Sequence, residues 1–315
     1  MTEAHNLDCA PAGLAGVVPL PDWGVLRVQG ADAASFLHAQ LTQDILHLPP
    51  GGARLAAWCS PKGRMLMSAV VWRLAPDVCL LAMPRSRIAP VLRRLAMFVL
   101  RAKVQLDDAS EAWSVAGAVG AALPATLAPE PWSSCDDATG RCWVRLWSGA
   151  GVARALVLQP AHGQWPQGGT LTDAWWRWLQ VMSAVPWVTE PVVEAFVPQM
   201  LNYESVGGVH FQKGCYPGQE VVARTQFRGA LKRRGTLWRV QGPVAVGQEL
   251  FHPSDAQQPA GLVADAAAHP AQPGLWHAVA SVQIAALDGQ ALRVGGLEGP
   301  CASPLPLPYA LRDDL

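Results

Sequence analysis

The spacing of apolar residues changes once along the chain, near Thr236, and this change restricts the folds open to it. Before it, segments with the two-residue period of strands are mixed with segments of helical spacing, which is typical of α+β proteins. After it, short strand-like segments are separated by Gly, Pro and Asp-Gly turns, as in small β-barrels. The sequence therefore predicts an α+β chain that ends in a barrel.

The strands expected before this point follow from alternating or continuous apolar runs. They are Trp23–Gln29, Ala53–Cys59, Met65–Trp72, Val78–Met83, Phe98–Leu106, Trp113–Ala118, Arg141–Trp147 and Val152–Leu158. One helix should begin at Asp32 as N-cap, because Phe36, Leu37, Leu41 and Ile45 follow at helical spacing. A second should begin at Ser86, with Pro90 in its first turn.

The chain has 315 residues, and its composition and N-terminus predict a soluble cytoplasmic protein. The longest apolar runs, such as Met65–Trp72, stop far short of the ~20 residues that a membrane span needs. The N-terminus carries Glu3 where a signal peptide would carry a basic residue. The seven cysteines are scattered without a CxxC pair, so the sequence contains neither a disulfide framework nor a recognisable metal-ligand set.

The charge balance excludes a globally basic nucleic-acid binder, because 24 basic residues face 24 acidic ones. Two windows depart from this balance: Arg85–Lys103 has six basic residues and no acidic one, and Phe211–Arg239 has seven against one. Each window is either a solvated face or part of a site for an anionic ligand.

A tryptophan stands out in the helix predicted over Leu171–Pro186. The apolar stripe of this helix consists of Trp175, Trp178, Leu179 and Met182. Trp176 lies outside the stripe, on the flank of Gln180 and Ser183. Two interpretations stay open: another part of the protein covers Trp176, or a flat ligand stacks on it.

A cysteine stands out in HFQKGCYPGQEVVAR, because Cys215 precedes a predicted helix that has Pro217 at its start and Gly229 at its end. The helix dipole and the nearby Lys213 would both lower the pKa of the thiol. Cys215 is therefore either a reactive nucleophile or a buried structural cysteine. His210 is a possible base for it, but the sequence identifies no third, orienting group.

The string KGCYPGQEVVAR resembles the signature of the YgfZ proteins, folate-binding relatives of the glycine cleavage T-protein, an aminomethyltransferase. Similar segments lie along most of the chain: WGVLRVQGADAASFLHAQLTQDI, CSPKGR, FVPQMLNYESVGGVHF, FRGALKRRG and PLPLPYAL. The resemblance implies a three-domain cloverleaf. Residues 1–49 and 112–236 would form a discontinuous folate-binding domain, 50–111 an inserted ferredoxin-like α+β domain, and 237–315 a C-terminal β-barrel.

The resemblance also implies a function and site residues. Family members bind tetrahydrofolate and support the assembly or repair of iron–sulfur enzymes, some of which modify tRNA. The functional pair of the family falls on Lys213 and Cys215, and its folate-contacting tryptophans fall on Trp23 and, aligned through Pro186, Trp176. The supporting motif residues are Gly214, Tyr216, Gly218, Gln219 and Glu220.

Basic residues such as Arg224 and Arg228 are expected to meet the glutamate tail of the folate. The expected partners are therefore tetrahydrofolate or a derivative and iron–sulfur client proteins, without a membrane or directly bound nucleic acid. Two alternatives are a one-carbon transferase and an RNA-binding module. The region around MPRSR does not match the transferase pattern that contains the catalytic aspartate of the T-protein, which argues against the first. The neutral charge argues against the second.

Overall fold

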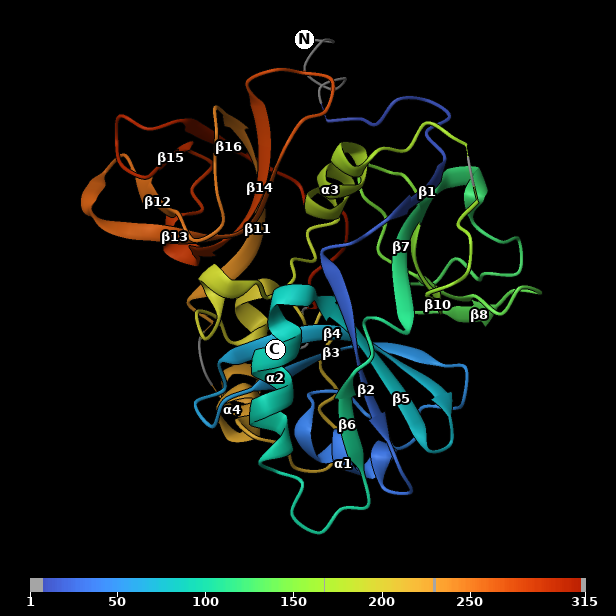
Figure 1. Cartoon of the computed structure of the whole chain (residues 1–315). Helices are drawn as coiled ribbons and strands as arrows, with labels where there is room; N and C mark the ends of the chain where they lie inside the picture. The colour runs from blue at the N-terminus through green and yellow to red at the C-terminus, as the bar shows by residue number, and fades with distance from the viewer. Residues whose placement is uncertain (1–7, 167, 229–230, 313–315) are drawn as a thin grey trace.

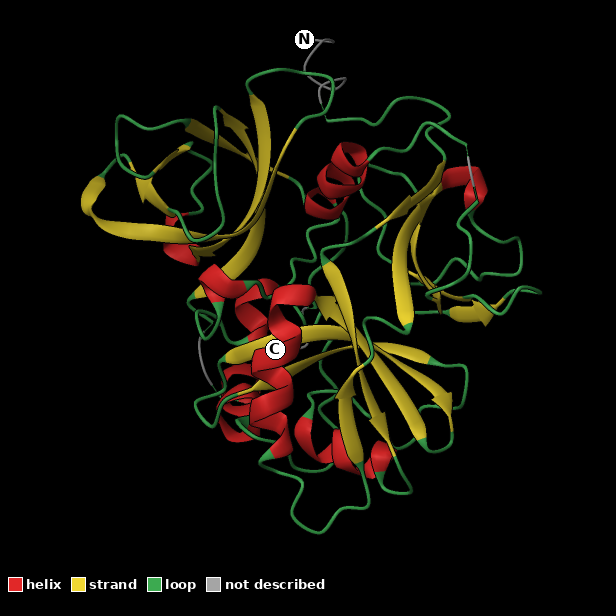
Figure 2. Ribbon diagram, in the orientation of Figure 1, coloured by secondary structure: helices red, strands yellow, loops and turns green. Residues whose placement is uncertain are grey.

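The computed structural model describes residues 8–166, 168–228 and 231–312. Two antiparallel sheets and a closed barrel surround a shared core, with helices mainly on the outside of one sheet (Figures 1 and 2). The helices are α1 (Ala33–Gln40), α2 (Arg85–Ala96), α3 (Asp173–Met182) and α4 (Gln219–Phe227). Short 3₁₀ helices are η2 (Gly120–Ala122), η3 (Glu190–Val192), η4 (Pro198–Leu201) and η5 (Ile284–Ala286).

One sheet has the order β3 (Ala53–Cys59), β4 (Met65–Ala75), β5 (Val78–Pro84), β2 (Trp23–Gln29) and β6 (Gln105–Asp108). Residues that alternate along these strands point to opposite faces. One face, with Trp58 and Leu81, packs on α1 and α2, and the other, with Trp72 and Leu80, joins the central core. Burial on both sides explains why Met65–Trp72 is apolar at every position except Ser68.

The second sheet has the order β1 (Gly16–Pro19), β7 (Trp113–Val119), β10 (Arg154–Pro160), β9 (Cys142–Arg145) and β8 (Ser134–Asp136). The helix α3 lies between this sheet and the barrel, as Figure 1 shows. Trp178 and Leu179 of α3 are fully buried there. The partly exposed Trp175 forms the edge of the predicted stripe.

The barrel closes through β11 (Arg233–Gln241), β14 (Leu275–Gln283), β13 (Asp255–Ala268), β12 (Glu249–His252), β15 (Leu292–Val294) and β16 (Cys301–Leu305). Pairing of β16 with β11 completes the ring, so no strand of it keeps an open edge. The predicted α+β chain with a C-terminal barrel is confirmed.

Four local predictions about α1, α2 and the strand after α2 were wrong. The first helix ends at Gln40, because Leu41 turns to an extended conformation and forms a bridge with Trp58. The carboxylate of Asp32 does not cap α1; it accepts from the Lys103 backbone N–H at 2.7 Å. Leu41 and Ile45 are nevertheless fully buried, so their assignment to the core was correct.

The strand expected over Phe98–Leu106 is limited to Gln105–Asp108. The preceding residues continue from α2 as turns and have no neighbouring strand, and the side chain of Leu100 is 86% exposed. Pro90 is the sixth residue of α2 and therefore lies beyond its first turn.

The predicted domain boundaries can be placed on the sheets. The boundary at residue 49 runs through the first sheet, because Trp23–Gln29 pairs with Val78–Pro84 on its far side. The boundary at residue 236 falls within β11. The division into domains stays a prediction. No helix in the described part of the chain is long and apolar enough to cross a membrane.

Candidate functional site

A cavity of about 160 Å³ lies between β2, α3 and β13. Trp23 and Trp176, the two tryptophans expected to hold folate, both line it, together with Trp187. The rings of Trp23 and Trp187 meet edge to face, with centroids 5.0 Å apart and an interplanar angle of 83°. The polar lining residues are Asp22, Asp173, Arg177, Gln180, Thr189 and Asp265. We call this space the tryptophan cavity.

The position of Trp176 is fixed by close packing. Its indole lies against Gly117 of β7, where a Cβ would overlap the ring. The guanidinium of Arg154 lies 5.1 Å from the ring centroid, and only 3% of Trp176 is exposed. The first interpretation, coverage by another part of the protein, is therefore confirmed, and stacking of a flat ligand stays a prediction. The protein covers most of the ring, and the remainder contributes to the cavity wall.

The predicted polar flank of α3 is also buried. Arg154 donates to Gln180 Oε1 at 2.7 Å and to Ser183 Oγ at 3.2 Å. Burial lowers the pKa of Arg154 to about 9. Gln180 and Ser183 thus hold a buried cation behind Trp176, and the polar side of α3 does not face water.

Arg177 and its partners bring charge to the tryptophan cavity. Its guanidinium pairs with Asp173 at 2.8 Å and with Asp22 at 3.2 Å, and its side chain is 56% exposed. Asp22 precedes β2 and Asp173 begins α3, so the two ion pairs join the elements that carry Trp23 and Trp176.

A second feature is the thiol loop, Lys213–Tyr216, which precedes α4. Cys215 is exposed, so it is not a buried structural cysteine. The helix begins only at Gln219, which leaves Pro217 outside its first turn, contrary to the prediction. Gly229, expected to end the helix, lies outside the described residues.

Among the remaining motif residues, Gly218 packs against the turn between β3 and β4. Gly218 has a left-handed backbone, with φ of 79°, and its missing side chain leaves room for Ser60 and Gly63. Tyr216 is buried, and its carbonyl accepts from the Gln219 N–H at 3.1 Å. Glu220 is exposed on α4.

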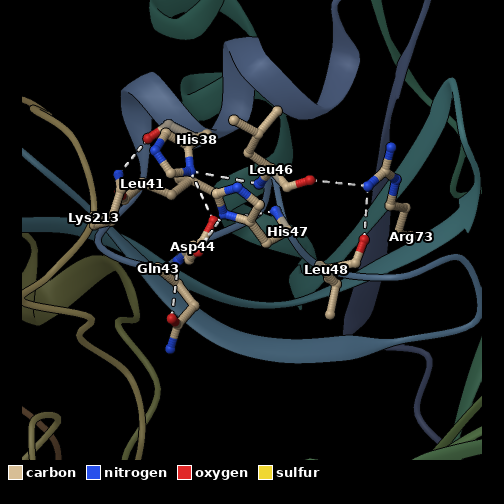
Figure 3. Close-up of polar contacts among 9 residues, drawn as sticks. All are labelled: His38, Leu41, Gln43, Asp44, Leu46, His47, Leu48, Arg73 and Lys213. Atoms are coloured by element: carbon tan, nitrogen blue, oxygen red, sulfur yellow. Dashed lines mark hydrogen bonds and ion pairs between the residues drawn. The ribbon is translucent and has the colours of Figure 1, made fainter.

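Lys213 is buried and attaches the thiol loop to the end of α1 (Figure 3). Its Nζ donates to the carbonyls of His38 and Leu41, and it lies 4.7 Å from the ring centroid of Tyr216. Burial lowers the pKa of Lys213 to about 8. Within the described part of the chain, its hydrogen bonds go to these carbonyls and not to Cys215.

A histidine that sequence reasoning missed lies beside the thiol loop. His38 Nδ1 is 3.0 Å from Asp44 Oδ1, and the other carboxylate oxygen is 2.8 Å from His47 Nδ1 (Figure 3). A Cβ on Gly214 would lie 3.5 Å from His38 Nε2. No spacing in the sequence could reveal this approach, because α1 and the thiol loop are far apart in the chain. The backbone N–H of His210, the possible base, donates to the carbonyl of Thr42 at 2.9 Å, and its role as a base stays a prediction.

The basic residues of α4 lie elsewhere. Arg224 and Arg228 are exposed and line a hollow with Glu220, Ala223 and Phe227, and not the tryptophan cavity. The structure therefore does not bring them together with the tryptophans.

Several cations of the two basic windows are paired with acidic residues, which weakens the case for a polyanion-binding face. The pairs are Arg85–Glu111, Arg87–Glu190, Arg234–Glu204 and Arg239–Asp8. No group of three His, Cys, Asp or Glu side chains within the described ranges could hold a metal ion.

Comparison with known proteins gives consistent matches. Residues 14–129 match the family model of the GCVT N-terminal domain. The tRNA-modifying protein YgfZ of Escherichia coli O17:K52:H18 is 30% identical over 240 residues, which cover 72% of each chain. The same-named protein of Cronobacter sakazakii is 29% identical over 239 residues, 72% of this chain and 71% of the relative. That of Vibrio atlanticus is 29% identical over 222 residues, just under two thirds of the relative's length at 66%.

Among solved structures, the glycine cleavage system aminomethyltransferase T from Bartonella henselae superposes with a TM-score of 0.67. The superposition covers 97% of this chain and 88% of that one at 14% identity, so it establishes a shared fold. Together with the sequence matches, this similarity shows that the chain belongs to the YgfZ family and has the T-protein fold.

Proposed function

We propose that this protein binds tetrahydrofolate or a derivative in the tryptophan cavity and has a folate-related role in tRNA modification. More specifically, it would act in the cytoplasm as an accessory protein for the assembly or repair of iron–sulfur enzymes. The observation that carries the proposal is the convergence of Trp23, Trp176 and Trp187 on one cavity. The relatives named as tRNA-modifying proteins add support.

The residues of the cavity suit a reduced pterin. Aromatic side chains favour flat heterocycles, and a few polar groups in a mainly apolar wall orient a ligand. Trp23 and Trp187 would contact the ring system, with Gln180, Thr189 and Asp265 as polar partners. The glutamate tail would leave past Arg177, whose side chain is half exposed. A bound tetrahydrofolate would supply a carrier for a one-carbon unit.

Cys215 would be the contact with client proteins. Its exposure on a loop lets it offer a thiol to a client cluster or a client cysteine. Lys213 would hold the loop in place through the carbonyls at the end of α1.

The folate part is tested by anaerobic calorimetric titration with tetrahydrofolate. Trp23→Ala is a better probe than Trp176→Ala, because Trp23 is only partly buried and its loss disturbs the core less. Trp113→Ala, a partly buried tryptophan outside the cavity, is the matched control. We expect saturable binding by the wild type and the control and a loss in Trp23→Ala. A folded wild type that does not bind would refute the proposal.

The client part is tested in a strain that lacks its own copy of the gene. Iron–sulfur enzyme activity and tRNA modification are measured after expression of the wild type or Cys215→Ser. We expect rescue by the wild type only. Full rescue by Cys215→Ser would remove the thiol from the proposal.

A further inference from the structure

Asp265 brings a carboxyl group from the barrel to the wall of the tryptophan cavity. It lies in β13 where the pairing with β14 shifts register: Val263 pairs with Ala280, whereas Asp265 pairs with Val279. One residue of β13, Ala264, is therefore extra, and a bulge of this kind re-aims the side chains beside it. Val263 and Ala264 are buried, so the carboxyl group interrupts an apolar part of the strand.

The two cations near Asp265 bond mainly with other groups, and Arg154 Nη1 is buried with no hydrogen-bond partner among the described residues. Arg154 approaches from β10, and its guanidinium donates to a main-chain carbonyl and to side chains of α3. Arg177 approaches from α3 and pairs with Asp173 and Asp22, the other carboxylates of the cavity. Asp265 forms no ion pair with any residue in the described ranges. A ligand would thus find an acceptor whose charge is not neutralised by direct contact.

The chemistry of this acceptor suits a paired donor. The backbone N–H of Ala266 donates to Asp265 Oδ1 at 2.9 Å. Burial raises the pKa of Asp265 to about 7, against the opposing effects of Ala266, Arg154, Gln180 and Arg177. The group can therefore become a carboxylate near neutral pH. A carboxylate forms its strongest hydrogen bonds with two parallel N–H donors.

We propose that Asp265 recognises the 2-amino-4-oxopyrimidine edge of a bound pterin, accepting from its ring N3–H and its 2-amino group. This inference rests on the proposed function, because it assumes that a folate enters the tryptophan cavity. It assigns the specificity for the pterin to a barrel residue, whereas the tryptophans supply contacts that any flat ring could make.

The size of the cavity favours recognition at this end of the folate. Its volume of about 160 Å³ is close to the roughly 150 Å³ of a protein cavity that holds one benzene molecule. Sites that enclose a whole drug-sized ligand measure about 300–1,000 Å³. The cavity is therefore too small to enclose a whole folate, so the pterin end would enter it and the aminobenzoyl-glutamate part would lie outside it.

The test is anaerobic calorimetric titration of the full chain with tetrahydrofolate, using wild type, Asp265→Asn and the control Asp107→Asn. Asparagine keeps the shape of the side chain, but it replaces one acceptor oxygen by an NH2 group. This group cannot accept a hydrogen bond from the N–H donors of the pterin. Losing a charge-assisted pair should weaken binding by about 10- to 100-fold. Asp107 pairs with Arg27 at 3.0 Å, and neither residue lines the cavity, so its control variant should keep the affinity of the wild type within about threefold.

Two further measurements do not depend on the stability of one variant. If the carboxylate form binds, the affinity of the wild type should rise by about tenfold from pH 6 to pH 8, and that of Asp265→Asn should stay level. A 2-desamino-2-methyl analogue of tetrahydrofolate should bind the wild type about tenfold more weakly than tetrahydrofolate, while Asp265→Asn should hardly distinguish the two ligands.

The outcomes separate the inference from the proposed function. If the folded wild type binds no tetrahydrofolate, both fail. If the wild type binds and Trp23→Ala does not, but Asp265→Asn binds within twofold of the wild type at both pH values, only the role of Asp265 is overturned.

Discussion

The replacement of Asp265 by Asn also tests, without a ligand, whether the folded protein resists charging this carboxyl group. Burial raises its pKa from 3.8 to about 7, so between these pH values the folded state holds a proton that the unfolded state has released. The contribution of Asp265 to the free energy of unfolding should therefore fall as the pH rises from about 4 to about 7 and level off above. A shift of about three units corresponds to about 4 kcal/mol. Because the carboxyl group lines a cavity, we expect about half of this value, about 2 kcal/mol.

The assay is urea unfolding of the wild type and of Asp265→Asn at four pH values from 5 to 8. The variant should be the more stable, and its advantage should grow by about 1–2 kcal/mol over this range. Asp137→Asn is the control. Burial would raise the pKa of Asp137, but hydrogen bonds from Thr139 and Trp143 lower it to about 2. Its folded and unfolded pKa values both lie below 5, so its effect on stability should not change between pH 5 and 8. If the difference in the free energy of unfolding between Asp265→Asn and the wild type stays constant from pH 5 to pH 8, the reasoning is refuted.

Three more substitutions test the surroundings of the two sites. Gly117→Ala should lower the free energy of unfolding by about 1–3 kcal/mol, because its Cβ would overlap Trp176; an unchanged urea midpoint would contradict this packing. Lys213→Met should lower the free energy of unfolding by about 2 kcal/mol, because it leaves two carbonyls at the end of α1 without their donor. Urea unfolding measures this change, and an unchanged free energy would argue that Lys213 does not anchor the thiol loop. The double variant Arg224→Ala and Arg228→Ala should bind tetrahydrofolate within about twofold of the wild type, because these arginines line a separate hollow; a larger loss in calorimetry would place the glutamate tail there.

Sequence patterns predicted elements whose stabilising contacts are local or repeated. The alternation in Trp23–Gln29 and the continuous run from Met65 correspond to observed strands. Thr172, the residue before α3, caps this helix by accepting from the Trp175 N–H. Such signals depend on neighbours within a few residues, and tertiary contacts reinforced them here.

Where tertiary contacts opposed the local pattern, the prediction failed. Apolar residues continue at helical spacing through Leu41 and Ile45, but the helix itself ends before them. The reason is that the chain turns at Leu41 to form a bridge with β3. The alternation over Phe98–Leu106 yields only Gln105–Asp108, because a strand requires a partner and only these residues lie beside β2.

By itself, the sequence determined the α+β class, the terminal barrel and the family, and it predicted Trp23, Trp176 and Cys215 as site residues. The tertiary structure alone decided which of these residues meet. Trp23 and Trp176 share a cavity with Asp265, whereas Arg224 and Arg228 lie on a different hollow. The reason is physical: a site assembled from a strand, a helix and a barrel depends on contacts between distant parts of the chain. Such contacts produce no recognisable spacing of residues in a single sequence.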